Sequence, residues 1–365
     1  MEFQNFLKTE EVNPSDLTPI MKQYYDFKIE YKDFILLFQV GSFFETYFDD
    51  AVIFSKICGL TVTKRKFKTG NVLMAGIPVS ELEIYVNKLI KNNLKVVVVS
   101  QMGKKDENGL MERKVTKTYT GGCLFDIEFL NPKENNYLAS VYKCGDIYQI
   151  CYSDISTGEI YFSSGDSDEI RCELGRISPV ELIIPSGNEI EKELYETYNF
   201  ELSDERFFKG EYENFAVNGV INYAKYILKD LMIEFEELKK YDIKKILMMD
   251  FLTRKNLELT YNSYNKSEKG TILKSLDNCK TPMGKRLLSS IISTPLSDLK
   301  EIQKRQNTLK KFLENDKITE KLSFLLTGLG DISRLKSRMS NKTITPLEFL
   351  TLKEGLKILS EIEKI

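Results

Sequence analysis

The stretch Phe34-Ile-Leu-Leu-Phe-Gln-Val-Gly-Ser-Phe-Phe-Glu45 decides how the first part of the chain folds. Its opening residues, 34–39, form an apolar run that predicts a buried strand. Val40-Gly41-Ser42 breaks this run, and two aromatic rings and a carboxylate follow. An aromatic ring with a hydrogen-bonding group beside it suits a protein that pries into stacked bases.

Two interpretations of Ser42 to Glu45 compete. Ser-x-x-Glu is a capping box, which predicts a helix starting at Phe43 with Phe43 and Glu45 facing opposite ways. A hairpin turn at Gly41 predicts instead a second strand over 43–47, on which Phe43, Glu45 and Tyr47 share one face. The run of β-formers from Phe43 onward favours the strand.

Taken alone, this spacing is most often a core ring beside a surface acid. Three details favour a base-reading pair: Phe43 shares its face with an acid, a glycine turn can project both, and a basic segment follows. Inserting a ring costs a few kcal/mol of unstacking, so insertion is favoured where stacking is already weak. A carboxylate near phosphates is repelled unless it accepts from a base edge, so it would select against ordinary duplex.

Composition sets the broad class. A chain of 365 residues predicts two or three domains, and 42% apolar residues with a mean hydropathy of −0.28 are typical of a soluble protein. The absence of histidine excludes Ser-His and Cys-His nucleophile pairs and histidine metal sites, which argues against an enzyme. Without a membrane-length apolar run or a signal peptide, we expect a cytoplasmic protein with no membrane contact. Six scattered cysteines predict reduced thiols.

Charge is strongly segregated along the chain. Residues 122–240 carry 11 Lys+Arg against 24 Asp+Glu, a net −13, whereas residues 241–365 carry 24 against 15, a net +9. Residues 61–121 carry 12 against 5, a net +7. Basic clusters flanking an acidic middle predict a polyanion partner.

Lys64, Arg65, Lys66 and Lys68 form the densest basic run, which we place in a glycine-containing loop over residues 65–71. A solvated charge run is the ordinary explanation. The alternative is phosphate contact, which supplies the sequence-independent part of DNA affinity. Arg113, Lys114 and Lys117, around a threonine-rich strand, would continue that surface.

The pattern of apolar residues predicts three regions. The first, 1–121, is a mixed-sheet α/β domain with a helix from Pro19 capped by Thr18, a helix capped by Asp49 or Asp50, and strands around 94–102 and 112–120. The second, 122–240, is an α/β domain with strands near 137–142, 148–155 and 159–163 and helices near 168–177, 189–197 and 215–229. The third, 241–365, is all-α, with long amphipathic stretches over 267–293, 297–314 and 346–365.

Two further motifs each lack residues that a catalytic or nucleotide site would need. Asp154-Ile-Ser-Thr-Gly158 is similar to the first carboxylate of ribonuclease-H-like nucleases, but metal-dependent hydrolysis needs further carboxylates that no pattern supplies. Thr281-Pro-Met-Gly-Lys-Arg286 contains Gly-Lys without the first glycine or the Ser/Thr of a phosphate loop.

Together these motifs resemble the MutS family of DNA mismatch-repair proteins over about residues 15–365. The matching segments are Thr18 to Tyr24, Leu36 to Glu45, Asp49 to Ala51, Thr63 to Arg65, Met74 to Pro78, Glu112 to Val115, Asp154 to Gly158, Ser178 to Leu182, Met249 to Leu259 and Thr281 to Gly284. The resemblance implies a mismatch-recognition domain, a ribonuclease-H-like connector and the start of a helical lever domain.

The resemblance also implies a function. Phe43 would be the wedge stacked on a mispaired base and Glu45 its hydrogen-bonding partner, in a DNA-binding set comprising Phe43, Glu45, Lys64, Arg65, Lys66, Lys68, Met74 and Arg113. Partners would be double-stranded DNA with mismatches or small loops, a second copy of the protein and a MutL-type repair protein. ATP and Mg²⁺ are expected only in an ATPase domain outside this chain, so the chain itself would have no catalytic role, cofactor or metal.

This sequence departs from the family pattern at several positions. Ser42 stands where the family usually has Asp, Phe44 where it often has Tyr, and Pro78-Val-Ser80 lacks the usual Tyr-His. Because residues 356–365 stop in helical phase without a C-cap, we expect a piece of a longer protein. The alternatives are a truncated MutS-like interaction protein without DNA reading, and a ribonuclease-H-like nuclease.

Overall fold

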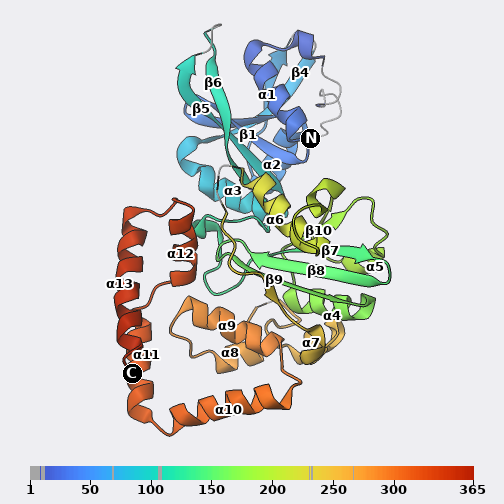
Figure 1. Ribbon diagram of the computed structural model, residues 1–365. Helices are drawn as coiled ribbons and strands as arrows, with labels where there is room; N and C mark the ends of the chain where they lie inside the picture. Colours follow the sequence, from blue (N-terminus) through green and yellow to red (C-terminus); the bar gives the residue numbers. More distant parts are fainter. Residues whose placement is uncertain are drawn as a thin grey trace. The chain divides into compact units, whose positions relative to one another are not determined.

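The chain folds into two compact units, Met1–Cys123 and Leu124–Ile365. The computed structural model describes residues 9, 13–67, 70–105, 109–229, 231, 233–265 and 267–365 (Figure 1). The predicted mixed α/β architecture followed by helices is confirmed. The three-domain division at residues 121 and 240 stays a prediction.

The first unit is built on a mixed sheet with the strand order β3-β4-β2-β1-β5-β6. Strands β1 and β5 are parallel and all other neighbours are antiparallel. Three α-helices accompany the sheet among the residues that the structure describes. The element bounds are α1 (Pro19–Glu30), β1 (Phe34–Val40), β2 (Phe43–Tyr47), α2 (Phe48–Cys58), β3 (Thr63–Phe67), β4 (Gly70–Pro78), α3 (Leu82–Ile90), β5 (Lys95–Lys105) and β6 (Met111–Tyr119).

The stretch from Phe34 to Glu45 forms most of the hairpin β1–β2. Gly41 has φ +61°, a left-handed conformation that glycine adopts without steric cost, and Val40 pairs directly with Phe43 across the turn. The strand interpretation of residues 43–47 is therefore confirmed, and the capping-box interpretation is wrong.

A buried ion pair fixes the hairpin to two helices. Lys28 on α1 donates from Nζ to Asp50 Oδ1 on α2 (2.9 Å) and to the Phe34 carbonyl (2.7 Å), while Asp50 Oδ2 accepts from the Leu36 amide (3.0 Å). Burial raises the pKa of Asp50, and the charge of Lys28 opposes that rise. Because every charged group has a partner, the pair holds α1, β1 and α2 together.

Two local predictions in this unit are wrong. Tyr47, not Asp49 or Asp50, is the N-cap residue of α2, since Asp50 is committed to the ion pair inside the unit. Residues 65–67 belong to β3 rather than to a loop, because pairing with β4 overrides the weak β propensity of lysine and arginine. Thr18 does occupy the N-cap position of α1, without a side-chain capping hydrogen bond.

The second unit contains a sheet in the order β11-β10-β7-β8-β9-β12. An antiparallel meander, β7 to β9, is followed by β10 and β11, which run parallel to β7, as expected for a ribonuclease-H-like connector. The bounds are β7 (Tyr137–Cys144), β8 (Ile147–Asp154), β9 (Glu159–Gly165), α4 (Ser167–Ile177), β10 (Glu181–Pro185), α5 (Lys192–Tyr195), β11 (Phe200–Ser203), α6 (Phe215–Ile227) and β12 (Lys239–Lys240).

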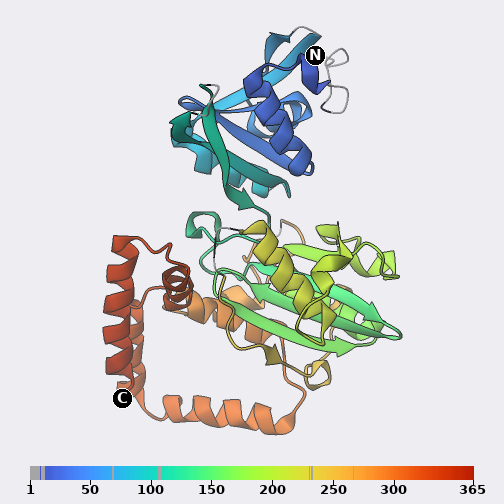
Figure 2. The same cartoon turned by 45° about the horizontal axis from the view of Figure 1, so that its top comes forward.

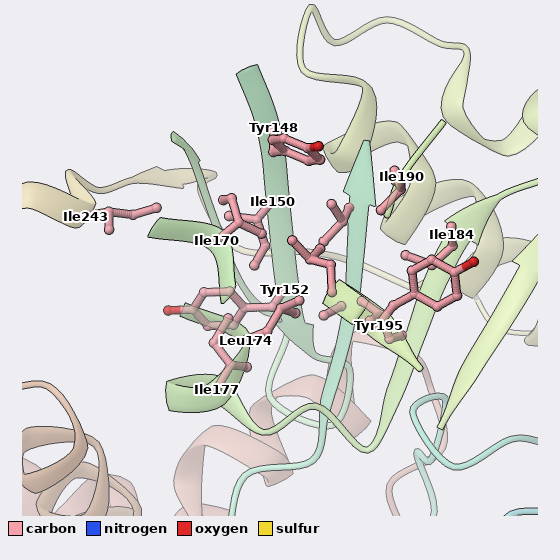
Figure 3. Packing of buried hydrophobic residues seen from close by; sticks show 14 residues of the cluster. Tyr148, Ile150, Tyr152, Ile170, Leu174, Ile177, Ile184, Ile190, Tyr195 and Ile243 are labelled. Atoms are coloured by element: carbon pink, nitrogen blue, oxygen red, sulfur yellow. The ribbon is translucent and has the colours of Figure 1, made fainter. Parts of the chain in front are cut away.

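A continuous apolar cluster packs on one face of this sheet. Figure 3 shows its isoleucines, leucines and tyrosines contributed by β8, β10, α4 and the segment around α5, including Ile150, Leu174 and Ile184, which are at most 1% exposed. Strand β7 adds Ala139 and Val141. This burial fixes the strand register, since a shift of one residue would turn the apolar side chains to the other face.

The remainder of the second unit is helical (Figure 2). The helices are α7 (Phe251–Leu257), α8 (Ile272–Leu276), α9 (Pro282–Ser293), α10 (Leu299–Leu313), α11 (Asp316–Thr327), α12 (Ile332–Ser340) and α13 (Pro346–Ile362). Helices α12 and α13 approach closely at Gly355, where an added Cβ would lie 2.3 Å from Ile332 Cδ1. None of the helices among the described residues has the length and apolarity needed to span a membrane.

Candidate nucleic-acid interface

The hairpin turn presents Phe43 to solvent. Phe43 is 48% exposed, whereas its neighbour Phe44 is 3% exposed and belongs to the core. Alternation along β2 therefore separates one projecting ring from one packed ring, as the sequence pattern predicts. The projecting ring lies at the first residue of the strand, directly after the turn.

The turn is braced from beneath. The side-chain amide of Gln39 donates to the Gly41 carbonyl (3.1 Å), and its oxygen accepts from the Gln101 amide on β5 (2.9 Å). The main-chain carbonyl of Gln39 accepts from Arg113 Nε on β6 (2.9 Å). These bonds tie the turn to β5 and β6, which fixes the point from which Phe43 projects.

Glu45 lies two residues along the same strand and is held by two side chains. Tyr47 donates its hydroxyl proton to Glu45 Oε2, and Arg65 Nη1 on β3 donates to the Tyr47 hydroxyl (2.9 Å). Arg65 Nη1 also lies 3.6 Å from Glu45 Oε2, within ion-pair distance. The side chain of Glu45 is 16% exposed and that of Arg65 is 49% exposed, so the carboxylate is partly sheltered beneath a more exposed guanidinium.

Tyr47 keeps its proton at neutral pH. Burial of the ring, and then its hydrogen bond to Glu45, raise the pKa of Tyr47 well above its usual range. The hydroxyl can therefore donate to the carboxylate while it accepts from the guanidinium. The three groups form one chain of hydrogen bonds running from Arg65 through Tyr47 to Glu45.

The basic run lies on β3, next to this chain of hydrogen bonds. Lys64 and Arg65 are exposed. Lys66 lies on the same strand, and Lys68 falls outside the described residues. Met74 on β4 is half-buried and stands opposite both Tyr47 and Thr63, so its position in the sheet is beside the Glu45 face rather than in the core.

Arg113 requires a correction. We predicted a phosphate contact, but Arg113 is 7% exposed, its guanidinium lies 4.6 Å from the centre of the Phe38 ring, and Nη1 donates to Gln23 Oε1 on α1 (2.7 Å). The sequence places Arg113 on a threonine-rich strand but cannot reveal that it packs on Phe38 and donates to Gln23 and Gln39. Arg113 supports the hairpin from inside the unit.

The carboxylate of Asp154 is used in hydrogen bonds within the fold. Its carboxylate accepts from the amides of Asn136 and Ser156 (both 3.0 Å) and from the Ser156 hydroxyl (2.6 Å). Gly158 closes the turn at φ +81°, where an added Cβ would lie 2.9 Å from the Glu234 carbonyl. Among the described residues, no cluster of acidic, cysteine or histidine side chains could hold a metal ion.

Two buried arginines in the second unit, Arg286 and Arg334, have no signal in the sequence that predicts their role. Arg286 on α9 donates to the Pro132 carbonyl (2.8 Å) and to both carboxylate oxygens of Asp331. Arg334 on α12, 1% exposed, donates to the carbonyls of Asn131 (3.0 Å) and Glu134 (2.9 Å). Both arginines therefore hold the segment 131–134 in place by hydrogen bonds to its main-chain carbonyls. Of the Gly-Lys-Arg286 motif that fails as a phosphate loop, Arg286 makes these contacts, whereas Lys285 donates to Glu268 and Asp277.

The chain matches three family descriptions in succession. Residues 18–128 match MutS domain I, residues 136–266 match MutS domain II, and residues 252–365 match MutS domain III. The hairpin, the Glu45 environment and β3 lie within the first match. Arg286 and Arg334 both lie within the third match, and the carbonyls that they bind lie near the start of the second unit.

Curated relatives agree over nearly the whole chain. Proteins named DNA mismatch repair protein MutS from Borreliella burgdorferi (strain ZS7), Dehalococcoides mccartyi (strain 195) and Caldanaerobacter subterraneus subsp. tengcongensis are 31%, 32% and 32% identical to it. Each alignment covers 96% of this chain and 44% of the relative. The chain thus spans less than half the length of the relatives it matches.

Proposed function

This chain belongs to the MutS family, and from that premise we propose that its first unit binds double-stranded DNA at a mispaired or unpaired base. The observation that carries the proposal is the exposed Phe43 ring, projected by a braced hairpin beside a carboxylate on the same strand face. The named relatives are mismatch-repair proteins, which supports the same substrate class.

Phe43 would act as a wedge between base pairs. Insertion of a ring unstacks a base step at a cost of about a few kcal/mol, and the contacts made by the kinked duplex must offset that cost. A mispaired step is already weakly stacked, so the same insertion costs less there. The wedge alone therefore gives a preference for mismatched duplex.

Glu45 would add a second test. A carboxylate that enters a groove is repelled by the phosphates, and only a base edge that donates a hydrogen bond compensates for this repulsion. Lys64, Arg65, Lys66 and Lys68 would contact phosphates on either side of the kinked step, which positions the protein without reading sequence. Met74 would line the same face of the sheet.

The other expected ligands and protein partners are proposed from family membership alone. We propose that the chain acts as a DNA-binding rather than a catalytic portion, with ATP and Mg²⁺ used outside it. Pairing with a second copy and with a MutL-type repair protein would follow from the same resemblance.

Phe43→Ala tests the wedge. The affinities of the 365-residue chain for a duplex with one mismatch and for the matched duplex are measured at one salt concentration. We expect the variant to lose the preference for the mismatch while weak, non-specific binding to both duplexes persists.

Phe324→Ala is the matched control, because Phe324 on α11 is 80% exposed and loses the same ring in the second unit. It should leave the preference intact. A Phe43→Ala variant that discriminates as well as the parent would overturn the assignment of Phe43 as the wedge.

A further inference from the structure

We propose that Arg65 and Tyr47 form a latch on Glu45 that makes base reading conditional on the transfer of Arg65 from the carboxylate to a DNA phosphate. This inference rests on the proposed function and adds two specificity-determining residues to it. Its basis is the continuous chain Arg65–Tyr47–Glu45, in which the donors and acceptors are matched.

Of the two arginines near Glu45, only the one in the latch is free to move. Within the part of the chain that the structure describes, Arg65 and Arg113 lie close enough to Glu45 and Tyr47 to act on them electrostatically. Arg113 is buried and committed to Gln39, Gln23 and the Phe38 ring, so it cannot leave. The side chain of Arg65 is 49% exposed, on a strand next to Lys64, and reaches Glu45 only at 3.6 Å. Arg65 is the partner that can exchange the carboxylate for a phosphate.

Tyr47 has a different part in the latch. Its ring is buried and held edge-on against Tyr24 at a centroid distance of 4.9 Å, so the hydroxyl is a fixed donor. When Arg65 leaves, this hydroxyl still donates to Glu45 and keeps the carboxylate oriented. The tyrosine is therefore a positioning residue for Glu45, and it also tethers Arg65 while no DNA is bound.

The exchange of Arg65 from carboxylate to phosphate explains how Glu45 could distinguish mismatched from matched duplex. With Arg65 in place, the charge of Glu45 is compensated and Arg65 makes no phosphate contact. Once Arg65 moves to a phosphate, Glu45 is left uncompensated near the backbone, which is unfavourable on matched duplex. On a mismatch, the wedge opens the stack, a base edge donates to Glu45, and both the new ion pair and the new hydrogen bond are gained.

The latch predicts different changes for its two members. Tyr47→Phe should remove the tether of Arg65, so that Arg65 reaches phosphates at a lower cost and matched duplex binds more tightly. The same change should leave Glu45 unoriented, so that mismatched duplex binds more weakly. Arg65→Gln should weaken mismatched duplex chiefly. The ratio used here is the dissociation constant for matched duplex divided by that for mismatched duplex. In both variants this ratio should fall by roughly three- to tenfold, the range that one hydrogen bond contributes.

The test is a double-mutant cycle with Glu45→Ala in the 365-residue chain. If Tyr47 and Arg65 act through Glu45, neither Tyr47→Phe nor Arg65→Gln should change the ratio once Glu45 is absent, and Arg65→Gln should then weaken both duplexes equally. A residue with a merely structural role would change the ratio equally in both backgrounds, which would overturn the latch. Tyr85→Phe on α3 and Lys91→Gln, an exposed lysine directly after α3, are the matched controls and should leave the ratio unchanged.

Failure of the latch is distinguishable from failure of the proposed function. If Phe43→Ala abolishes mismatch preference while Tyr47→Phe and Arg65→Gln leave the ratio at the parent value, the latch is wrong and the wedge stands. If the parent chain shows no preference, or Phe43→Ala retains it, the proposed function fails and the latch fails with it. Thermal unfolding of each variant verifies folding, and Arg65→Gln serves this purpose best because Arg65 is exposed.

Discussion

At the scale of single residues, Glu45 is less isolated than its sequence position indicates. It is paired with Arg65 and receives a hydrogen bond from Tyr47, so its removal changes more than one charge. Glu45→Ala should tighten binding to matched duplex, because it removes a negative charge near phosphates and releases Arg65 to contact them. The dissociation constant for matched duplex at low salt measures this. Glu83→Ala on α3, an exposed acid in the same unit, controls for net charge. Weaker binding to matched duplex would contradict this role of Glu45.

Arg113 has the opposite character at the same scale, since it serves the fold. Arg113→Ala removes donors to the Gln39 carbonyl and Gln23 together with the contact to Phe38. Loss of buried, charge-assisted hydrogen bonds should cost about 1–3 kcal/mol of the free energy of unfolding. Chemical denaturation of the first unit is the measurement, and Lys114→Ala, next along β6 with a side chain 63% exposed, is the control. Equal stability of the two variants would mean that Arg113 does not brace the turn.

At the scale of elements, the basic strand β3 should carry the salt dependence. Each phosphate that a cation neutralises contributes a slope of roughly −0.9 to the log–log dependence of affinity on salt. Replacing Lys64, Arg65 and Lys66 together by glutamine should flatten that slope by up to about 2–3, and by similar amounts for both duplexes apart from the contribution of Arg65. Titrations at several salt concentrations measure it. The same triple change at the exposed residues Lys304, Lys310 and Lys311 of α10 is the control. If the β3 replacement leaves the slope unchanged, the basic run is exposed to solvent and does not contact phosphates.

The elements also show what the sequence could predict. The β1–β2 hairpin was predictable because its signals are local: an apolar run, a glycine that adopts a positive φ and a run of β-formers. The meander β7–β9 and helices α4 and α6 were predictable for the same reason. Strands β10 and β11 were not identified, because short parallel strands have no turn signal linking them and depend on pairing with a distant partner.

The site was predictable only in part. Alternation along β2 predicts that Phe43, Glu45 and Tyr47 share a face, but it cannot show that Arg65, which is 20 positions from Glu45 in the sequence, pairs with it. That contact depends on β4 bringing β3 into the sheet. The same limit explains the error at Arg113, whose burial depends on α1 and β1 rather than on its own strand.

At the scale of the whole molecule, the buried arginine pair organises the second unit. Arg286→Ala leaves Asp331 without its bidentate partner inside the unit, and loss of one member of a buried ion pair costs up to about 3–5 kcal/mol. We expect a lower urea midpoint for the second unit and faster hydrogen exchange over residues 131–134. Arg305→Ala on α10, an exposed arginine, should change neither. Unchanged exchange at 131–134 in the Arg286 variant would show that the anchor is not needed.

The grip on residues 131–134 has an evolutionary consequence. Arg286 and Arg334 donate to the main-chain carbonyls of Asn131, Pro132 and Glu134, not to their side chains. Every amino acid carries the same carbonyl, so substitutions in this segment preserve the acceptors. Carbonyls also do not titrate. The segment is therefore free to vary in sequence while its attachment is retained, and selection should act on the two arginines that hold it.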